Sequence, residues 1–392
     1  MLKGAARFWK SANPTSRATD LSNHFSWFAR LCSAAFVFAH ATAALAASEA
    51  LLHACFAPPT LVGVSGEEVV QRGNRSHDAP ISIAGFTPAA PVPDALRGSI
   101  RRVAVPKGKK VIALTFDLCE QRGEIAGYDG RIFDYLRAQG VKATFFAGGK
   151  WIISHRERTE QLMADPLFEI GNHTETHANL RLLNDAAIRQ QVLAPQKAYE
   201  DARADFAAKQ CVASVPDAAQ NIPAQPTLFR FPYGTCNPAS LKAVNDAGML
   251  AIQWDVATGD PDPHESAERI AAAMVNEAKP GSIIVNHANG RGWHTAEALP
   301  IAIPKLKAKG YEFVTVTELM KMGKPVIASE CYDRKPGDVN RYDFLWALSK
   351  PLKGTSAKPG LNVPVVRTAA SKTTTAAKKR AAVTAAPATP GN

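Results

Sequence analysis

Long hydrophobic runs and cysteines are both scarce in this sequence. Its 392 residues contain six cysteines, too few for a chain of this length to rely on disulfides in place of a hydrophobic core. After residue 45, no apolar run approaches the roughly 20 residues that a membrane-spanning helix needs. Hydrophobic residues nevertheless make up 46% of the chain, which is enough for one large buried core or two ordinary ones.

Acidic residues are scarce at both ends of the chain, and the net charge of +11 arises there. Residues 1–46 contain five basic residues and one acidic residue, and residues 350–392 contain eight basic residues and no acidic one. The region between them is therefore nearly neutral. Because a nucleic-acid groove needs cations clustered on a folded domain, this pattern predicts no nucleic-acid partner.

The N-terminal region has the organisation of an export signal. A basic, polar stretch runs to Arg30, an apolar stretch follows at residues 31–45, and Ala44-Leu45-Ala46 suits cleavage by signal peptidase. We expect residues 1–46 to be a cleaved signal peptide. The mature protein would then lie in the periplasm or cell envelope, or be secreted, without a transmembrane segment. The alternative is an uncleaved anchor, but His40 and the many alanines make a weak spanning helix.

Five cysteines remain after the expected cleavage, at positions 55, 119, 211, 236 and 331. Outside the cytoplasm some of them can pair, although their number is odd. Cys211 and Cys236 are a candidate pair because they flank one loop-rich insertion. The sequence leaves the connectivity open.

Short apolar runs alternate with helix-length amphipathic stretches from residue 109 onward. The predicted strands cover residues 111–116, 143–147, 168–171, 228–231, 249–254, 282–286 and 313–316. The predicted helices cover residues 131–139, 185–208, 238–247, 265–277 and 296–309, and three of them are followed by an expected C-cap glycine, at Gly140, Gly248 and Gly310. This alternation predicts an α/β fold with a parallel sheet covered by helices. Seven such units fit a distorted (β/α)7-type barrel, whose chemistry lies at the C-terminal ends of the strands.

Composition divides the rest of the chain. Residues 47–107 are rich in Pro, Gly and Ala and are expected to form an irregular, partly disordered lead-in to the β/α domain at residues 108–325. A C-terminal extension covers residues 326–349. Residues 350–392 consist mostly of Lys, Ala, Thr and Pro, which cannot bury enough surface to fold, so we expect a basic disordered tail. The tail either favours anionic cell-envelope polymers or is simply solvated.

Polar side chains collect where the predicted strands end. Asp117 follows the first strand, His173 and His177 follow the third, and Arg230 and His287 lie at the ends of the fourth and sixth. Individually, such residues are more often helix caps, surface ion pairs or packed side chains than functional groups. Because a barrel brings its strand ends together, we expect all five to meet at one site. Two histidines four residues apart can hold one metal ion.

The order of these motifs resembles that of the polysaccharide deacetylase family, also called the NodB-homology or carbohydrate esterase 4 family. The similar segments are Thr115-Phe116-Asp117, His173-Thr174-Glu175-Thr176-His177, Arg230-Phe231-Pro232-Tyr233-Gly234 and Ile284-Val285-Asn286-His287. The chain from Ala298 to Val314 also resembles the closing helix and strand of the family. The resemblance covers residues 109–322 and implies a distorted β/α barrel.

The resemblance also implies a role for each site residue. His173 and His177 would hold a divalent metal, with zinc expected, that polarises the acetyl carbonyl and lowers the pKa of bound water. Asp117 would act as the general base and His287 as the acid that protonates the leaving group. Arg230 would orient Asp117 and keep it ionised.

The resemblance also implies how the oxyanion is stabilised. The backbone N–H near Tyr233, in the turn that contains Pro232, would help to stabilise the oxyanion. Trp254 and Trp293 could stack on a sugar face. The aromatic pattern does not select the glycan, and chitin-type oligosaccharide, peptidoglycan and exopolysaccharide all remain open.

The sequence departs from the first motif of the family. That motif has two adjacent acids, the second of which binds the metal, whereas Leu118 stands at this position here. A leucine cannot bind a metal, so a site with two histidines alone should bind metal more weakly. Cys119, Glu120, Asp117 itself or additional water would have to complete the coordination shell.

The fourth motif is also altered. Ala257 stands where the family pattern has an Asp. Either Asp255 or Asp260 could take over the role of tuning His287, and the sequence does not select between them.

The sequence therefore predicts an exported, metal-dependent hydrolase that removes acetyl groups from an N-acetylated or O-acetylated polysaccharide or oligosaccharide, such as chitooligosaccharide or peptidoglycan. One alternative is a glycan-binding barrel that has lost catalysis, but Asp117, Arg230 and His287 are retained and a pure binder needs no base and acid. A second alternative is an amidohydrolase of the same fold that acts on a small amide. The export signal favours a polymer substrate instead.

Overall fold

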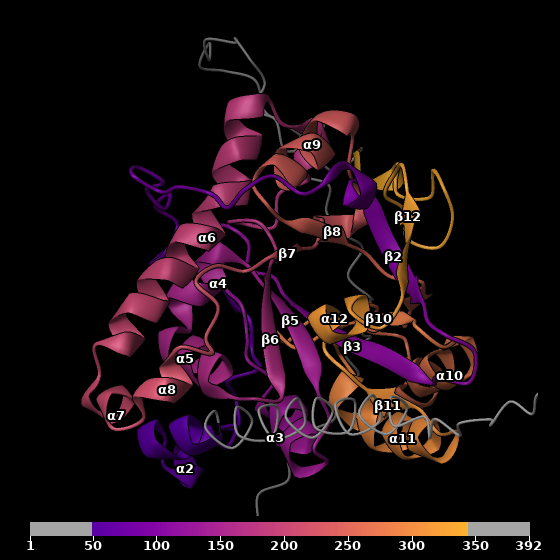
Figure 1. Ribbon diagram of the computed structural model, residues 1–392, viewed down its shortest axis with the longest axis horizontal. Coiled ribbons are helices and arrows are strands. Elements are labelled where there is room, and N and C mark those ends of the chain that lie inside the picture. Colours follow the sequence, from indigo (N-terminus) through magenta and orange to yellow (C-terminus); the bar gives the residue numbers. More distant parts are fainter. Residues whose placement is uncertain (1–48, 344–392) are drawn as a thin grey trace, which may run out of the picture. The chain divides into compact units, whose positions relative to one another are not determined.

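The computed structural model describes residues 49–343, so the predicted signal peptide and the predicted tail lie outside the described residues. The α/β architecture is confirmed, with a curled ten-stranded sheet and helices packed against it (Figure 1). None of the helices within the described range is long and apolar enough to cross a membrane. The strands of the sheet are β2 (Ser99–Ala104), β3 (Val111–Leu118), β5 (Ala143–Ala147), β6 (Phe168–Asn172), β7 (Leu228–Phe229), β8 (Leu250–Ile252), β9 (Val256–Ala257), β10 (Ile283–His287), β11 (Glu312–Phe313) and β12 (Lys324–Ala328).

The strands follow the order β12-β2-β8-β7-β6-β5-β3-β10-β9, and β11 pairs with the start of β3. Every pairing is parallel except that of β12 with β2. All residues of β3 and β5 are buried, as expected for central strands covered on both faces. This arrangement is the distorted (β/α)7-type barrel that the sequence predicted.

The sheet curls because its β2 side approaches the start of β10 at Gly281. Arg102 and Ser282 form a β-bridge, and the Val103 N–H donates to the Gly281 carbonyl at 2.9 Å. Gly281 has φ 85°, and a Cβ at this position would lie 1.7 Å from the Val103 carbonyl oxygen. Only glycine permits this approach, so one residue allows the sheet to turn back on itself.

Helices cover the outside of the sheet. The longer ones are α3 (Gly130–Ala138), α5 (Arg156–Ala164), α6 (Asp185–Ala207), α9 (Pro238–Asp246), α10 (Ala267–Glu277) and α11 (Thr295–Ala308). Helix α5 was not predicted, whereas the bounds of the other five agree with the predicted helices to within two residues, and Gly140, Gly248 and Gly310 have the positive φ of the predicted caps. The short helices are α2 (Pro58–Leu61), α4 (Gly149–Ser154), α7 (Gln210–Ala213), α8 (Pro216–Ala219) and α12 (Val316–Met320), and the 3-10 turns are η1 (Asp94–Leu96), η2 (Leu180–Leu182) and η3 (Pro232–Gly234).

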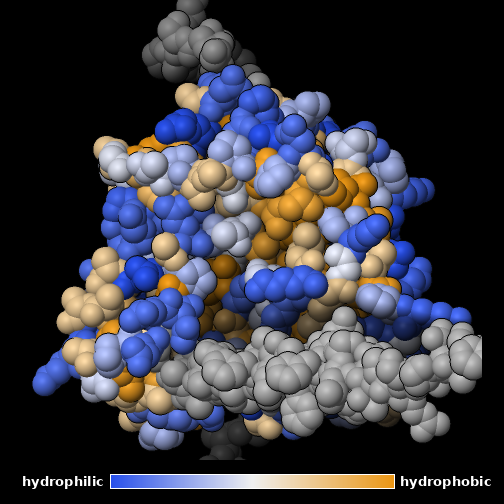
Figure 2. Space-filling view, viewed as in Figure 1, coloured by the Kyte–Doolittle hydropathy of each residue, from blue (hydrophilic) through white to orange (hydrophobic). Residues whose placement is uncertain are grey.

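Helix α12 packs on the end of the barrel where the strands begin. Its Val316 and Leu319 are fully buried and join a hydrophobic cluster with Val111 of β3 and Ile252 of β8. Figure 1 shows α12 near the middle of the view, surrounded by strands. In the same view, Figure 2 shows apolar side chains in a hollow near β2 and β8, surrounded by hydrophilic ones. Helix α12 therefore covers the start of the central strands, and the polar strand ends lie at the opposite edge.

Of the ten strands of the sheet, the sequence analysis missed the longer β2 and β12 and the two-residue β9, and it placed one strand wrongly. Strand β2 lies in the lead-in and β12 near the boundary with the C-terminal extension, and neither was predicted. The sequence of β2 contains two arginines, and Arg101 is buried because its guanidinium stacks 3.7 Å from the ring of Tyr332. The last predicted strand, 313–316, is wrong at its end because Thr315 caps α12.

The lead-in also packs on the loop that follows β3. Strand β1 (Gln71–Arg72) forms a two-stranded antiparallel sheet with β4 (Glu124–Ile125). Asp78 accepts from the Gly123 N–H. These contacts attach the first described residues of the chain to the loop next to the end of β3.

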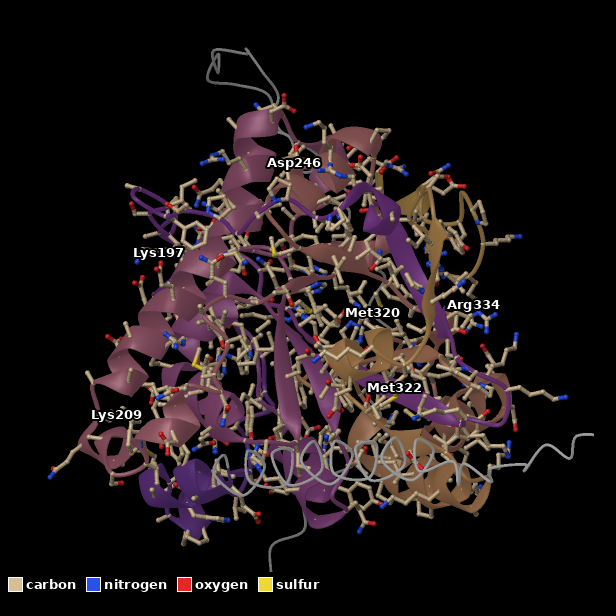
Figure 3. The ribbon with its side chains drawn as sticks, viewed as in Figure 1. Lys197, Lys209, Asp246, Met320, Met322 and Arg334 are labelled. Carbon is tan, nitrogen blue, oxygen red and sulfur yellow. A yellow bond between two sulfur atoms is a disulfide. The ribbon has the colours of Figure 1, made fainter. Side chains whose placement is uncertain are left out.

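Two disulfides lie within the described residues, Cys55–Cys211 and Cys236–Cys331. The candidate pair Cys211–Cys236 is therefore wrong, because each of these cysteines bonds to a partner that is distant in sequence and close only in the fold. Lys209, labelled in Figure 3, lies beside the first disulfide and forms an ion pair with Glu160. The remaining described cysteine, Cys119, is buried and free.

A non-reducing peptide map should contain one disulfide-linked peptide pair joining Cys55 to Cys211 and another joining Cys236 to Cys331. Replacing both Cys236 and Cys331 with Ser should lower the free energy of unfolding by about 2–5 kcal/mol, because the cross-link no longer restricts the unfolded chain. Denaturant titration of this variant and of the wild type measures the loss. A linked peptide that joins Cys211 to Cys236 would contradict the connectivity.

Candidate active site and metal centre

A buried ion pair between Asp117 and Arg230 lies at the C-terminal end of β3. Arg230 follows β7 and has no exposed surface, and its Nη1 lies 2.9 Å from Asp117 Oδ1 and 2.8 Å from Thr115 Oγ1. Burial alone would raise the pKa of Asp117, but the charge and hydrogen bond of Arg230, together with the nearby His287, outweigh it and hold the pKa below its ordinary value. The carboxylate is therefore ionised at neutral pH.

His173 and His177 lie beside this ion pair, with ring centroids 5.0 Å apart. His173 Nδ1 is 2.9 Å from the carbonyl oxygen of Arg230, and because a carbonyl can only accept, Nδ1 carries the proton. Its Nε2 then keeps a lone pair, 3.5 Å from Asp117 Oδ2. His173 Nε2 and His177 Nδ1 are buried and have no hydrogen-bond partner. Burial lowers the pKa of both imidazoles, so both are neutral, as metal ligands must be.

The backbone around these side chains is strained. Three non-glycine residues in the described chain have positive φ, and all three lie here: Thr174 at 67°, His177 at 54° and Tyr233 at 59°. L-residues rarely adopt this conformation, and such strain concentrates at functional sites. The strained turns orient His177 and Tyr233 so that their rings meet at a centroid distance of 4.5 Å.

Strand alternation separates Leu118 from the polar residues around it. Leu118 is fully buried in the hydrophobic cluster between the sheet and its helices, together with Phe116 and Phe133. Because successive side chains of a strand point to opposite faces, Asp117 and Cys119 share the other face. The Cys119 sulfur and one ring nitrogen each from His173 and His177 lie within 4.8 Å of one another. Burial raises the pKa of the Cys119 thiol to about 12.

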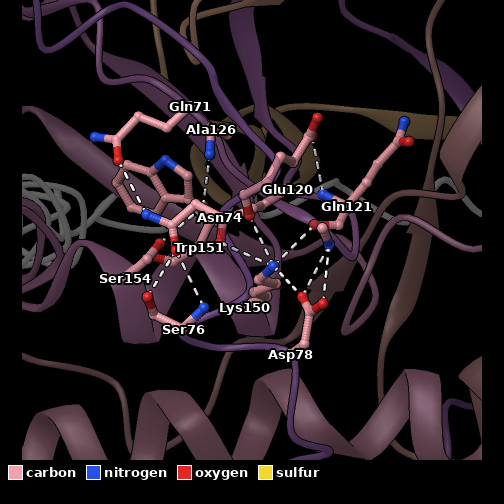
Figure 4. Close-up of polar contacts among 12 residues, drawn as sticks. Gln71, Asn74, Ser76, Asp78, Glu120, Gln121, Ala126, Lys150, Trp151 and Ser154 are labelled. Atoms are coloured by element: carbon pink, nitrogen blue, oxygen red, sulfur yellow. Dashed lines mark hydrogen bonds and ion pairs between the residues drawn. The ribbon is translucent and has the colours of Figure 1, made fainter.

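Glu120, another residue considered as a replacement ligand, makes its contacts elsewhere. Its Oε2 accepts from the Ala126 N–H at 3.0 Å and from Ser154 Oγ at 2.8 Å, and its Oε1 lies 3.9 Å from Lys150 Nζ (Figure 4). Lys150 also pairs with Asp78 of the lead-in. Burial raises the pKa of Glu120 to about 7. Glu120 thus belongs to a polar network that joins β3, α4 and the lead-in.

His287 ends β10 and lies opposite Asp117 in the register of the sheet. Its Nδ1 is 3.0 Å from Asp260 Oδ1, and Asp260 Oδ2 accepts from the His287 N–H at 2.6 Å and from Thr295 Oγ1 at 2.7 Å. Burial opposes the charged imidazolium, but the charge and hydrogen bond of Asp260 outweigh burial and raise the pKa of His287. Of the two acids that the sequence left open, Asp260 is the one that contacts His287.

Asp255 has a different role. Its Oδ1 accepts from the Ile283 N–H and its Oδ2 from Ser282 Oγ, both at 2.9 Å. Both partners lie at the start of β10, at the opposite end of that strand from His287. Asp255 therefore fixes the start of the strand.

The aromatic residues proposed to contact sugar differ in accessibility. Trp254 is 7% exposed and its indole N–H donates to Asp333 Oδ1 at 3.0 Å, so its ring is not free to stack on a ligand. Trp293 is 51% exposed, and its backbone N–H donates to the Asp260 carbonyl at 3.2 Å, which holds it near His287. Tyr233 and the buried Pro232 lie together in η3, which begins two residues after Arg230.

Three supporting residues were missed by the sequence analysis. Thr115 accepts from Arg230, Thr295 donates to Asp260, and Asn289 donates from Nδ2 to the Cys119 sulfur at 3.0 Å. Thr115 had a usable signal, since it lies two residues before Asp117 and therefore on the same face of β3. The other two follow β10, and no sequence pattern connected them with the site.

Asp260→Asn should lower the pKa of the His287 imidazole, because the substitution removes the carboxylate charge that raises it. Asp255→Asn is the matched control, since it makes the same change in a partly buried carboxylate that bonds Ser282 and Ile283 instead, and it should leave the pKa of His287 unchanged. NMR titration of the imidazole signals, assigned with His287→Gln, measures both. Equal shifts in the two variants would contradict the assignment of Asp260.

Comparison with known proteins confirms the resemblance found in the motifs. The family model described as polysaccharide deacetylase matches residues 104–252. A peptidoglycan-N-acetylglucosamine deacetylase of Bacillus cereus is 31% identical over 222 residues, which cover 55% of this chain and 91% of that protein. A chitooligosaccharide deacetylase of Bradyrhizobium sp. is 27% identical over 229 residues, which cover 54% of this chain and 91% of that protein.

Among solved structures, a family 4 acetyl xylan esterase from Clostridium thermocellum, in complex with a cobalt ion, is 30% identical. The alignment covers 54% of this chain and 91% of that chain, with a TM-score of 0.43. Deacetylases of this family are metal-dependent. On the family match and the near-complete coverage of the Bacillus cereus relative, this chain belongs to the polysaccharide deacetylase family.

Proposed function

We propose that this protein is a metal-dependent hydrolase that removes acetyl groups from an N-acetylated or O-acetylated glycan, with peptidoglycan and chitooligosaccharide as the first candidates. The observation that carries the proposal is the arrangement of an ionised Asp117 and a His287 of raised pKa around two histidines with unused ring nitrogens. The names of the Bacillus cereus and Bradyrhizobium relatives support the glycan class.

The donor set of His173 and His177 fits a divalent cation, for which zinc is the proposed metal. Both imidazoles are neutral, and each has a buried nitrogen that no protein group satisfies. When bound, the metal supplies Lewis-acid polarisation of the acetyl carbonyl and lowers the pKa of water.

Asp117 is the proposed general base. It accepts a proton from the water that attacks the acetyl carbon. Arg230, at 2.9 Å, holds the carboxylate ionised and fixes its orientation, because its guanidinium also bonds Thr115. The backbone N–H near Tyr233, beside Pro232, is the proposed donor to the oxyanion that forms.

His287 is the proposed general acid. As the bond between the acetyl carbon and the leaving nitrogen or oxygen breaks, His287 donates a proton to the leaving atom and the products are acetate and the free amine or hydroxyl. Asp260 supports this role because it raises the pKa of His287, so that more of the imidazole is protonated near neutral pH. The neighbouring Trp293 is the proposed sugar platform.

Export is part of the proposal. Residues 1–46 have the pattern of a signal peptide. Two disulfides within the described residues support an oxidising compartment, such as the periplasm or cell envelope, because such bonds rarely persist in the cytosol.

Acetate release from chitooligosaccharide, peptidoglycan and acetylated xylan tests the activity. The zinc-supplemented protein should release acetate from at least one of them, and chelation should abolish the release. Asp117→Asn should lower kcat by about 10²–10⁴-fold, the usual contribution of a general base. Asp255→Asn, which changes a partly buried acid outside the proposed machinery, is the control and should stay within a few-fold of the wild type after correction for folded protein.

Different results would contradict different parts of the proposal. Glycan binding without acetate release from any substrate would favour a catalytically impaired binding barrel. Release from small amides alone would favour an amidohydrolase of the same fold. If the rate survives in Asp117→Asn, Asp117 is not the base, and if His173→Ala leaves metal content and rate unchanged, the metal assignment is wrong.

A further inference from the structure

The free thiol of Cys119 lies where the two site histidines lack a third partner. Strand β3 directs Leu118 into the hydrophobic cluster under the helices, whereas Cys119 shares the face of Asp117. The Cys119 sulfur and a ring nitrogen from each of His173 and His177 lie within 4.8 Å of one another, and no other group of three His, Cys, Asp or Glu side chains in the described chain converges this closely.

The surroundings of the three side chains provide an independent indication of a ligand. His173 Nε2 and His177 Nδ1 are buried polar atoms without a hydrogen-bond partner, and His173 itself is 1% exposed. An unsatisfied buried polar atom costs about 1–3 kcal/mol, so two such atoms beside one thiol need a further explanation. A cation bound to both of these ring nitrogens would remove the free-energy cost of leaving them unsatisfied.

The sulfur of Cys119 also has a hydrogen-bond donor of its own. Asn289, which is fully buried, places its Nδ2 3.0 Å from the sulfur and also donates to the Cys119 carbonyl. An amide N–H directed at sulfur stabilises negative charge there. Outer-shell donors of this kind fix the orientation of metal ligands.

We propose that Cys119 is the third protein ligand of the metal and binds it as a thiolate, so that a Cys-His-His set stands in place of one that contains a carboxylate. This inference rests on the proposed function, since it concerns the same metal. The thiol loses its proton to solvent as the metal–sulfur bond forms. Three protein ligands leave the fourth tetrahedral position open, as catalytic zinc sites do.

The thiolate also determines which metals the site accepts. A soft sulfur ligand with two imidazoles favours Zn²⁺ and Co²⁺ and disfavours Mg²⁺, Ca²⁺ and Mn²⁺, which bind oxygen ligands. The Cys119 thiolate therefore replaces the carboxylate ligand that Leu118 cannot provide. The total charge of the ligand set is the same, because a thiolate and a carboxylate each carry one negative charge.

Cobalt substitution tests the ligand without any measurement of activity. The metal-free full chain should bind one equivalent of Co²⁺ with a near-ultraviolet band from thiolate-to-cobalt charge transfer, and an excess of Mg²⁺ should not displace it. Cys119→Ser should lose the band and bind Co²⁺ at least about 100-fold more weakly, since even an outer-shell loss costs 10–100-fold. Cys119→Asp should recover much of the affinity without the band. Asn289→Ala should weaken binding by about 10–100-fold.

Asp255→Asn is the control, because its carboxylate bonds Ser282 and Ile283 at the start of β10 and lies outside the proposed ligand set. It should keep the band. A wild-type spectrum without the band, or a band that persists in Cys119→Ser, would overturn the assignment, and circular dichroism checks that each variant is folded. If the band is present and no glycan loses acetate, the ligand stands and the proposed function fails. If acetate is released and the band is absent, the proposed function stands and Cys119 is not the ligand.

Discussion

The ion pair between Arg230 and Asp117 removes two charges from bulk water, because Arg230 has no exposed surface and Asp117 is only 4% exposed. Each charge loses several kcal/mol of hydration, which the pair recovers only if its geometry is good and its other hydrogen bonds are satisfied. Arg230 meets this condition, because it bonds Thr115 as well as Asp117, approaches the carbonyl of Ile252 and stacks 4.1 Å from the ring of Phe146. The pair therefore joins β3, β5 and β8 to the end of β7 at one point.

The two histidines proposed as metal ligands depend on the same arginine. The carbonyl of Arg230 accepts from His173 Nδ1 and so directs the other ring nitrogen toward Asp117. Tyr233, three residues later, packs against His177. The positive φ of His177 and Tyr233 costs free energy, which the buried barrel around them must supply. One short segment after β7 thus positions Asp117 and both histidines together.

Much of the fold could be predicted because its signals are local. The predicted helices agree closely with α3, α6, α9, α10 and α11, since amphipathic periodicity and C-cap glycines depend on neighbouring residues only. Strand β2 could not be predicted in this way. Its Arg101 is buried through contact with Tyr332, more than two hundred residues away. The disulfides escaped prediction for the same reason, because their partners are 156 and 95 residues apart.

The sequence alone determined the order of strands and helices and the presence of Asp117, His173, His177, Arg230 and His287 at successive strand ends. A parallel barrel requires such residues to converge, so the site could be located before any coordinates. The sequence could not determine which of several residues close together in the chain faces that site. The tertiary structure decided between Asp255 and Asp260, and among Leu118, Cys119 and Glu120, because these choices depend on side-chain direction and on contacts between strands.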